Sequence, residues 1–136
     1  MYIDANLLLS DGQVICDAAS EMSSYSVDLK AARKVWGGKQ LYVVVIVDVA
    51  IDTATSIDFQ VVTDTEETLS SPTIQITTGP IAIASLTANR APIVIPIGSA
   101  IGTEEQFLGL YYVLAGSANV SGAVTAFVAF DAPGNP

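Results

Sequence analysis

The residue types on which enzymes most often depend are scarce in this sequence. It has no histidine, and its single cysteine, Cys16, has apolar neighbours and no basic residue nearby. The commonest general base is therefore missing, and the setting of Cys16 is typical of a small core side chain rather than of an activated thiolate. Zinc sites built from Cys and His are excluded, and no phosphate-binding glycine motif is present. We expect no catalytic residue, no bound cofactor and no enzymatic activity.

The carboxylates offer one further possibility, a calcium site. The densest acidic run is Asp64-Thr-Glu-Glu67, between two predicted strands. Oxygen ligands suit calcium, but this run lacks the ligand spacing of an EF-hand loop. The sequence therefore predicts a solvated acidic loop here, with no metal bound.

The basic residues are gathered in one place. Four of the five, Lys30, Arg33, Lys34 and Lys39, lie within ten residues around Trp36. Such a patch could dock on an acidic neighbour with Trp36 as an aromatic anchor. The alternative is a solvated loop with Trp36 tucked into the core. The sequence leaves both interpretations open.

Length and composition limit the class of protein to which this chain can belong. The chain has 136 residues, of which 51% are hydrophobic and 14% charged, and its net charge is −9. The length suits one domain, residues 1–136; the hydrophobicity argues against disorder, and the acidity against nucleic-acid binding. No apolar run approaches the roughly 20 residues of a spanning helix, and the N-terminus does not resemble a signal peptide. We expect synthesis in the cytoplasm, no membrane contact, and surplus apolar surface covered by other protein.

The local patterns predict strands. Apolar and polar residues alternate in 56–63 and in 73–78, where Ile74 and Ile76 would share a face before Gly79-Pro80 ends the strand. Prolines mark 93–97 as an edge strand, 106–115 and 122–131 are expected to form a hairpin, and 13–17 and 24–29 are weaker candidates. Only single helical turns are predicted, at 31–34 and 85–90. This pattern predicts an all-β, single-domain jelly roll or antiparallel sandwich of about eight strands with little helix.

Two of these strands are apolar on both faces. Leu41–Val47 and Gly122–Asp131 carry almost no polar side chain on either side. Because one face of an antiparallel sandwich normally meets water, their outer face is expected to be covered. A partner subunit and the chain's own loops are equally good candidates for the cover.

The two ends of the chain differ in character. Residues 1–12 form a possible N-terminal arm, whose side chains Tyr2, Ile3, Leu7 and Leu8 are too apolar for a free terminus. We expect them to pack against the sandwich or against a neighbouring subunit. The last residues, 132–136, are expected to be a flexible tail.

An ordered set of short segments runs over nearly the whole chain: Met1–Asp4, Leu8–Ser10, Val27–Leu29, Leu41–Val45, Phe59–Asp64, Ser70–Pro72, Tyr111–Tyr112 and Gly122–Ala126. No single motif among them is diagnostic, but as an ordered set they resemble the capsid cement (decoration) proteins of tailed bacteriophages. The basic stretch and Trp36 have no counterpart in the family pattern.

The resemblance implies a jelly-roll domain that assembles as a homo-dimer or homo-trimer. Such proteins sit on the outside of an icosahedral shell of major capsid protein with the HK97 fold, bridge its subunits and stabilise the head. The expected location is the virion exterior. The candidate partner-binding residues are Tyr2, Ile3, Leu7, Leu8, Lys30, Arg33, Lys34 and Trp36.

Two other functions remain open. A carbohydrate-binding jelly roll would use tyrosines as a platform, but Tyr111 and Tyr112 are adjacent and would point to opposite faces of their strand. Another virion component, such as the base of a head fibre, would share the fold and differ only in its place in the particle.

Overall fold

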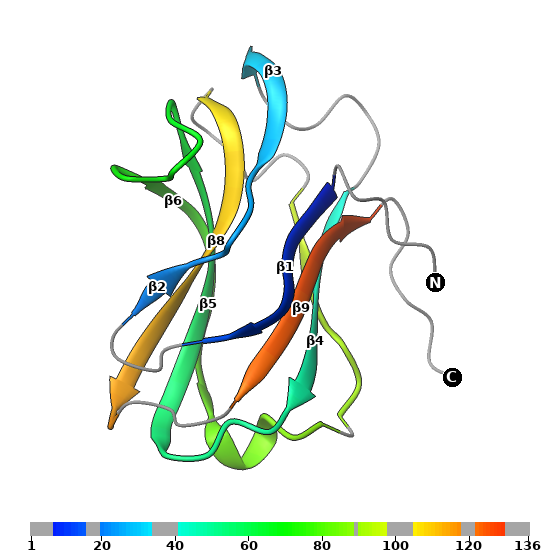
Figure 1. Cartoon of the computed structure of the whole chain (residues 1–136), viewed down its shortest axis with the longest axis vertical. Helices are drawn as coiled ribbons and strands as arrows, with labels where there is room; N and C mark the ends of the chain where they lie inside the picture. Colours follow the sequence, from blue (N-terminus) through cyan, green and yellow to red (C-terminus); the bar gives the residue numbers. More distant parts are fainter. Residues whose placement is uncertain are drawn as a thin grey trace.

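In the described part of the chain, nine strands form two antiparallel sheets (Figure 1). The computed structural model describes residues 7–15, 20–33, 41–88, 90–97, 105–117 and 122–129. Sheet I has the order β1-β9-β4-β7. Its strands, in chain order, are β1 (Leu8–Val14), β4 (Tyr42–Val49), β7 (Ile93–Pro96) and β9 (Ala123–Ala129).

Sheet II faces sheet I and has the order β2-β8-β5-β6, with β3 also pairing β8. Its strands, in chain order, are β2 (Glu21–Met22), β3 (Val27–Arg33), β5 (Ala54–Asp64), β6 (Thr73–Ala82) and β8 (Glu105–Gly116). A single 3-10 turn, η2 (Ile83–Ser85), follows β6. The predicted all-β sandwich is confirmed. If β2 and β3 are counted as two parts of one strand, the two sheets have four strands each, as in a jelly roll.

The core lies between the sheets and is built from alternate residues of the facing strands. On β4 the inward side chains are Val43, Val45 and Val47, and opposite them on β5 are Ile57, Phe59 and Val61, all at most 3% exposed. Phe59 also meets Tyr112 of β8 edge to face, with ring centroids 5.7 Å apart. Period-2 alternation therefore positions the core as the sequence predicts.

One side of the sandwich is closed by hydrogen bonds between β1 and the β2–β3 segment. The backbone N–H of Tyr25 donates to the carbonyl of Leu9. The side chain of Gln13 adds further links: its Nε2 donates to the Met22 carbonyl at 3.0 Å, and its Oε1 accepts from the Ser24 N–H at 2.9 Å. These bonds tie an edge of sheet I to an edge of sheet II.

The predicted hairpin of the last two strands is wrong. β8 lies in sheet II between β5 and β2, whereas β9 lies in sheet I between β1 and β4. The connection between them therefore passes from one sheet to the other. A connection of this length suits both a hairpin within one sheet and a crossing between two sheets, so the turn-forming residues could not distinguish the two.

The helical turn predicted at 31–34 is also wrong over its described part, because Val27–Arg33 forms β3. Pairing with β8, where Arg33 lies opposite Glu105, overrides the helix propensity of Ala31 and Ala32. Of the turn expected at 85–90, the Arg90 N–H donates to the Thr87 carbonyl at 3.3 Å, and the 3-10 turn η2 lies just before it. The edge position predicted for β7 is confirmed.

Two bulges change β6 from its predicted form. Val61 pairs with Ile76 and Val62 with Ile74, so Gln75 is an extra residue. Ile76 consequently packs on the core while Ile74 is 54% exposed on the other face, and the prediction that they share a face is wrong. The strand also continues through Gly79-Pro80, because Gly79 takes a φ of +75° at the second bulge.

Candidate functional site

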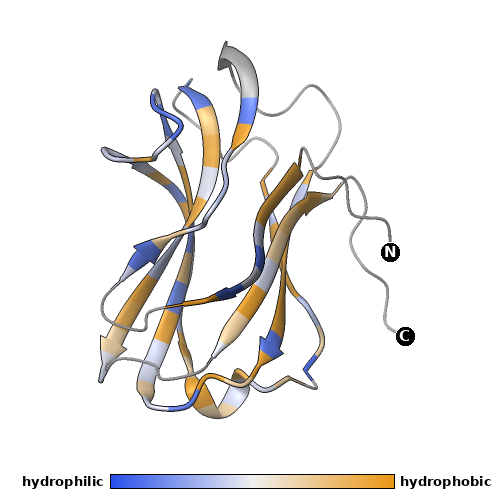
Figure 2. Ribbon diagram, viewed as in Figure 1, coloured by the Kyte–Doolittle hydropathy of each residue, from blue (hydrophilic) through white to orange (hydrophobic). Residues whose placement is uncertain are grey.

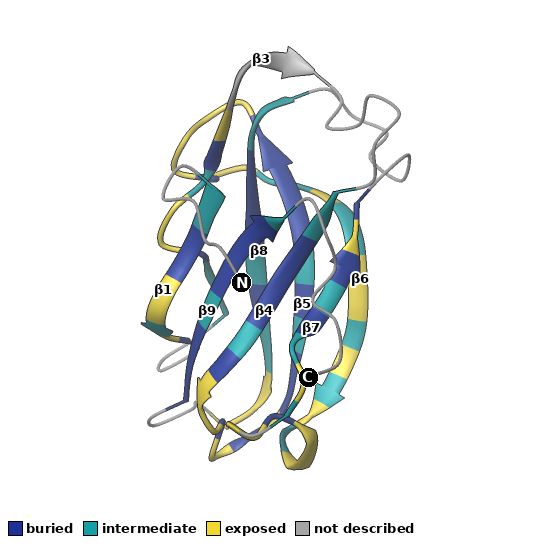
Figure 3. Cartoon of the chain, turned by 90° about the vertical axis from the view of Figure 1, so that its right-hand side faces the viewer, coloured by how far each residue is buried: buried dark blue, intermediate teal, exposed yellow. Residues whose placement is uncertain are grey.

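The outer face of sheet I is apolar and covered at its centre. A row of facing residues crosses all four strands: Leu8 lies opposite Phe127, Phe127 opposite Val44, and Val44 opposite Val94. These side chains point away from the core, yet Val44 and Phe127 are 0% exposed. Figure 3, which looks onto this face, shows β4 and β9 buried along most of their length. The predicted covering of these two-sided strands is confirmed.

Where β1 and β4 end, the same face is open to solvent. Val14 and Val49 flank Ala123 on neighbouring strands and are 44% and 46% exposed. The polar groups nearby are paired with each other, because Thr125 donates to the Asp48 carboxylate and accepts from the backbone N–H of Gly12. We call this outer face of sheet I the apolar face. Its apolar members are Leu8, Val14, Val44, Val49, Val94, Ala123 and Phe127.

The outer face of sheet II is covered at one end by the β5–β6 loop. Leu69 in this loop is 2% exposed and lies against Gly109 of β8. A Cβ atom added at Gly109 would overlap with the Cδ1 atom of Leu69. Val62, opposite Gly109 in the pairing, is fully buried beneath the same loop. A loop of the chain itself therefore covers this part of sheet II.

Asp64 anchors that loop. Its carboxylate is buried and accepts backbone N–H groups of Thr65 at 2.6 Å, Glu66 at 3.3 Å and Ser71 at 2.7 Å. Burial by itself raises the pKa of Asp64, but these hydrogen bonds to the charged form outweigh it and lower the pKa below its ordinary value. The predicted acidic loop is thus only partly solvated: Glu66 and Glu67 are exposed, whereas Asp64 is structural.

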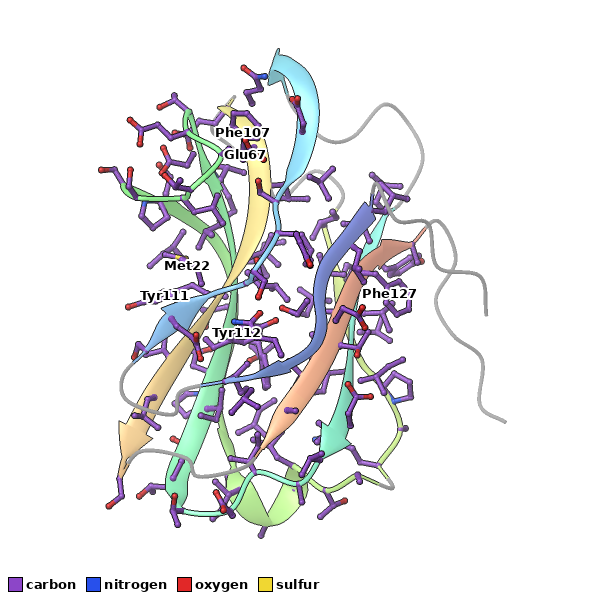
Figure 4. The ribbon with its side chains drawn as sticks, in the orientation of Figure 1. Met22, Glu67, Phe107, Tyr111, Tyr112 and Phe127 are labelled. Carbon is purple, nitrogen blue, oxygen red and sulfur yellow. The ribbon has the colours of Figure 1, made fainter. Side chains whose placement is uncertain are left out.

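The rest of the outer face of sheet II is uncovered and mixes aromatic with acidic groups. Met22, Tyr111 and Gln60 follow one another across β2, β8 and β5, and Asp58 lies in the next row. Tyr111 is half-buried and points outward, whereas Tyr112 is 0% exposed and points into the core, as predicted for neighbours in a strand. Figure 4 shows Met22, Phe107 and Tyr111 on this sheet, and Glu67 near its covered end.

Charge divides the two sheets. Most of the described carboxylates belong to sheet II or its β5–β6 loop; they are Glu21, Asp28, Asp58, Asp64, Glu66, Glu67 and Glu105. Hydropathy follows the same division, with apolar residues predominant along β4 and β9 and hydrophilic ones recurring along β2 and β5 (Figure 2). We call the outer face of sheet II, with the two exposed glutamates of its loop, the acidic face; its members are Met22, Asp58, Gln60, Glu66, Glu67, Phe107 and Tyr111.

The predicted partner-binding residues are only partly described. Leu7 is half-buried and packs on the core, and Leu8, also half-buried, begins β1. Lys30 and Arg33 lie on β3, in a part whose backbone alone is described. Tyr2, Ile3, Lys34 and Trp36 lie outside the described residues, as do Cys16 and the tail, 132–136.

The structure does bring together the points where those segments attach. Leu8 starts β1 beside the end of β9, and Tyr42 starts β4 beside both Ala129 and Pro96. Arg33 ends β3 beside the start of β8. Residues 1–6 and 34–40 therefore join the described sandwich at one and the same end, which no spacing in the sequence indicated.

Within the described ranges no three Cys, Asp or Glu side chains are placed to hold a metal ion. None of the helical segments there is long and apolar enough to cross a membrane. What the described residues provide is surface: one apolar face and one acidic face, on opposite sides of the sandwich.

These features define a β-sandwich protein with one apolar and one acidic outer face. The chain belongs to the Bbp16 family, whose model matches residues 9–128. This family is phage-associated, so the chain is a phage-related structural protein. No curated protein matches it.

Proposed function

We propose that this protein is a capsid cement protein of a tailed phage. After synthesis in the host cytoplasm it binds the outer surface of an icosahedral shell built from a major capsid protein of the HK97 fold. There, as a homo-dimer or homo-trimer, it bridges neighbouring subunits and stabilises the head. The role requires no catalysis, no cofactor and no metal.

The outer face of sheet I carries this proposal. In a free sandwich the outward side chains of an antiparallel sheet are mostly polar. Here the row from Leu8 to Val94 is apolar, and its neighbours Val14 and Val49 remain substantially exposed. Exposed valines on an apolar sheet are typical of a subunit that is covered by protein in its assembled state.

A bridging protein also needs at least two contact surfaces, and the sandwich has two that differ in chemistry. The apolar face suits burial, whereas the acidic face suits polar and charged contacts. Each contact can be modest, because many copies on one shell hold neighbouring subunits together and the contacts reinforce one another.

A map of the phage particle by electron cryomicroscopy tests the proposal. We expect density for the sandwich on the exterior of the head, in contact with at least two capsid subunits. Particles from a phage that lacks the gene are the control and should lose only that density. Density in the tail or in a head fibre, or none in the virion, would overturn the proposal.

A further inference from the structure

We propose that the acidic face docks on a lysine- and arginine-bearing surface of the shell. The inference rests on the proposed function and adds to it the face that is used and the chemistry of the partner. Three features support it: carboxylates without a cationic partner among the described residues, one buried acceptor without a donor, and half-buried aromatic side chains on the same face.

The carboxylates of this face have no cationic partner among the described residues. Asp58 accepts hydrogen bonds from the neutral groups of Gln60, at 3.1 Å, and Thr77, at 2.7 Å. Glu66 accepts from the Ser70 hydroxyl, and the Glu67 side chain is exposed on the same loop. The described side-chain cation, Arg90, donates instead to the carbonyls of Ser85 and Ala91. Within the described part of the chain, this negative charge is therefore not neutralised by a cation.

Gln60 supplies an independent observation. Its Nε2 donates to Asp58, while its Oε1 is buried and has no hydrogen-bond donor. A buried acceptor without a donor costs free energy, which is recovered if the Gln60 amide turns toward a donor on a bound partner. Gln60 lies between Tyr111 and Thr77 in the sheet pairing, at the centre of the acidic face.

The apolar members of the face suit the same partner. Tyr111 and Phe107 are half-buried and lie four residues apart on the same side of β8, with the covered Gly109 between them, and Met22 lies opposite Tyr111. Aromatic ring faces attract lysine and arginine, and the long stems of those side chains pack on apolar groups. A cationic surface thus satisfies the carboxylates, the rings and the Gln60 acceptor together.

The apolar face does not suit this partner, because its outward side chains are mostly apolar: Leu8, Val14, Val44, Val49, Val94 and Phe127. The two faces can therefore be tested separately with variants that change net charge equally. Glu66→Gln with Glu67→Gln removes two charges from the acidic face. Asp11→Asn with Asp52→Asn removes two from exposed positions on β1 and the β4–β5 loop.

The experiment measures co-sedimentation of each purified full chain with phage heads that lack this protein, at low and high NaCl. We expect wild-type binding to weaken as salt rises. The glutamate pair should lose about fivefold to tenfold in affinity at low salt and depend less on salt, whereas the aspartate pair should bind as the wild type does. Tyr111→Ala should lose at least about tenfold, and Tyr111→Phe little.

Equal losses for the two acidic pairs, or no loss for either, would overturn the inference while leaving the cement function standing. Failure of the wild type to bind heads at any salt concentration would overturn the proposed function itself. Thermal unfolding of each variant controls for folding, and Tyr111→Phe keeps the aromatic ring where Tyr111→Ala removes it.

Discussion

The hydroxyl oxygens of Ser10 and Tyr112 lie 2.6 Å apart, in the buried interior between the two sheets. Ser10 donates its own proton to Gln13 Oε1 at 2.7 Å, so Tyr112 is the donor in the bond to Ser10. The link joins β1 of sheet I to β8 of sheet II, residues that are 102 positions apart in the chain. It gives the apolar interior one directional contact that sets how the two sheets align.

Replacing Tyr112 with Phe tests this link. The ring and its contact with Phe59 remain, but the Ser10 hydroxyl loses its donor, so we expect the free energy of unfolding to fall by about 1–2 kcal/mol. Urea denaturation measures the loss. Tyr111→Phe is the matched control, since that hydroxyl lies on the outer face, and it should change stability by less than about 0.5 kcal/mol. Equal effects would show that the link contributes nothing.

The pKa of Asp64 predicts a pH dependence. Because the folded-state pKa is lowered below its ordinary value of 3.8, the charged carboxylate stabilises the fold above that value. This contribution is lost as the pH falls through the lowered pKa. Asp64→Asn should cost about 1–3 kcal/mol near neutral pH, and its deficit relative to the wild type should shrink below about pH 4.

The measurement for Asp64 is urea denaturation from pH 7 down to pH 2. Asp11→Asn, an exposed carboxylate on β1, is the control and should be close to neutral throughout. A deficit of Asp64→Asn that is the same at every pH would contradict the assigned role of the charge.

Gly109 should tolerate no side chain while Leu69 covers it. Gly109→Ala places a Cβ against Leu69 Cδ1, so the buried Leu69 side chain must move, and we expect a loss of about 1–3 kcal/mol. In a Leu69→Ala background the same change should cost much less, because the obstructing atom is gone. A double-mutant cycle measures this coupling, and simple additivity of the two losses would refute the contact.

Phe127 should behave as a core residue although it lies on an outer face. Since it is 0% exposed, Phe127→Ala should cost about 3–5 kcal/mol. Val49→Ala, on the same face but 46% exposed, should cost less than about 1 kcal/mol in the isolated protein. Thermal and urea unfolding compare the two, and similar small losses would show that this face is not covered in solution.

The N-terminal segment can be tested without damaging the sandwich. Leu9 is fully buried and Leu8 lies in β1, so a deletion must stop before them. Deletion of residues 2–6 removes Tyr2 and Ile3 alone among the candidate contacts. We expect a lower oligomer mass by light scattering or weaker binding to phage heads. Unchanged assembly together with unchanged binding would remove these residues from the contact set.

The alternation of apolar and polar residues carried much of the fold prediction. It indicated β5, β8 and the two-sided β4 and β9 correctly, because a side-chain period of two is a local property of the extended backbone. It could not show that β8 and β9 belong to different sheets, since pairing partners are chosen by packing across the whole chain. It also failed at Gln75, because a bulge shifts the faces of a strand without leaving a signal in the composition.

The sequence by itself determined the class of this protein: an acidic, all-β chain without the residues for common catalysis and with more apolar strand surface than one core needs. Only the tertiary structure decided where that surface lies and what accompanies it. It gathered carboxylates from β2, β3, β5, β8 and a loop onto one sheet and left an apolar face on the other. It also laid Leu69 over Gly109 and joined Ser10 to Tyr112. Such contacts link residues far apart in the chain, so only the folded arrangement defines them.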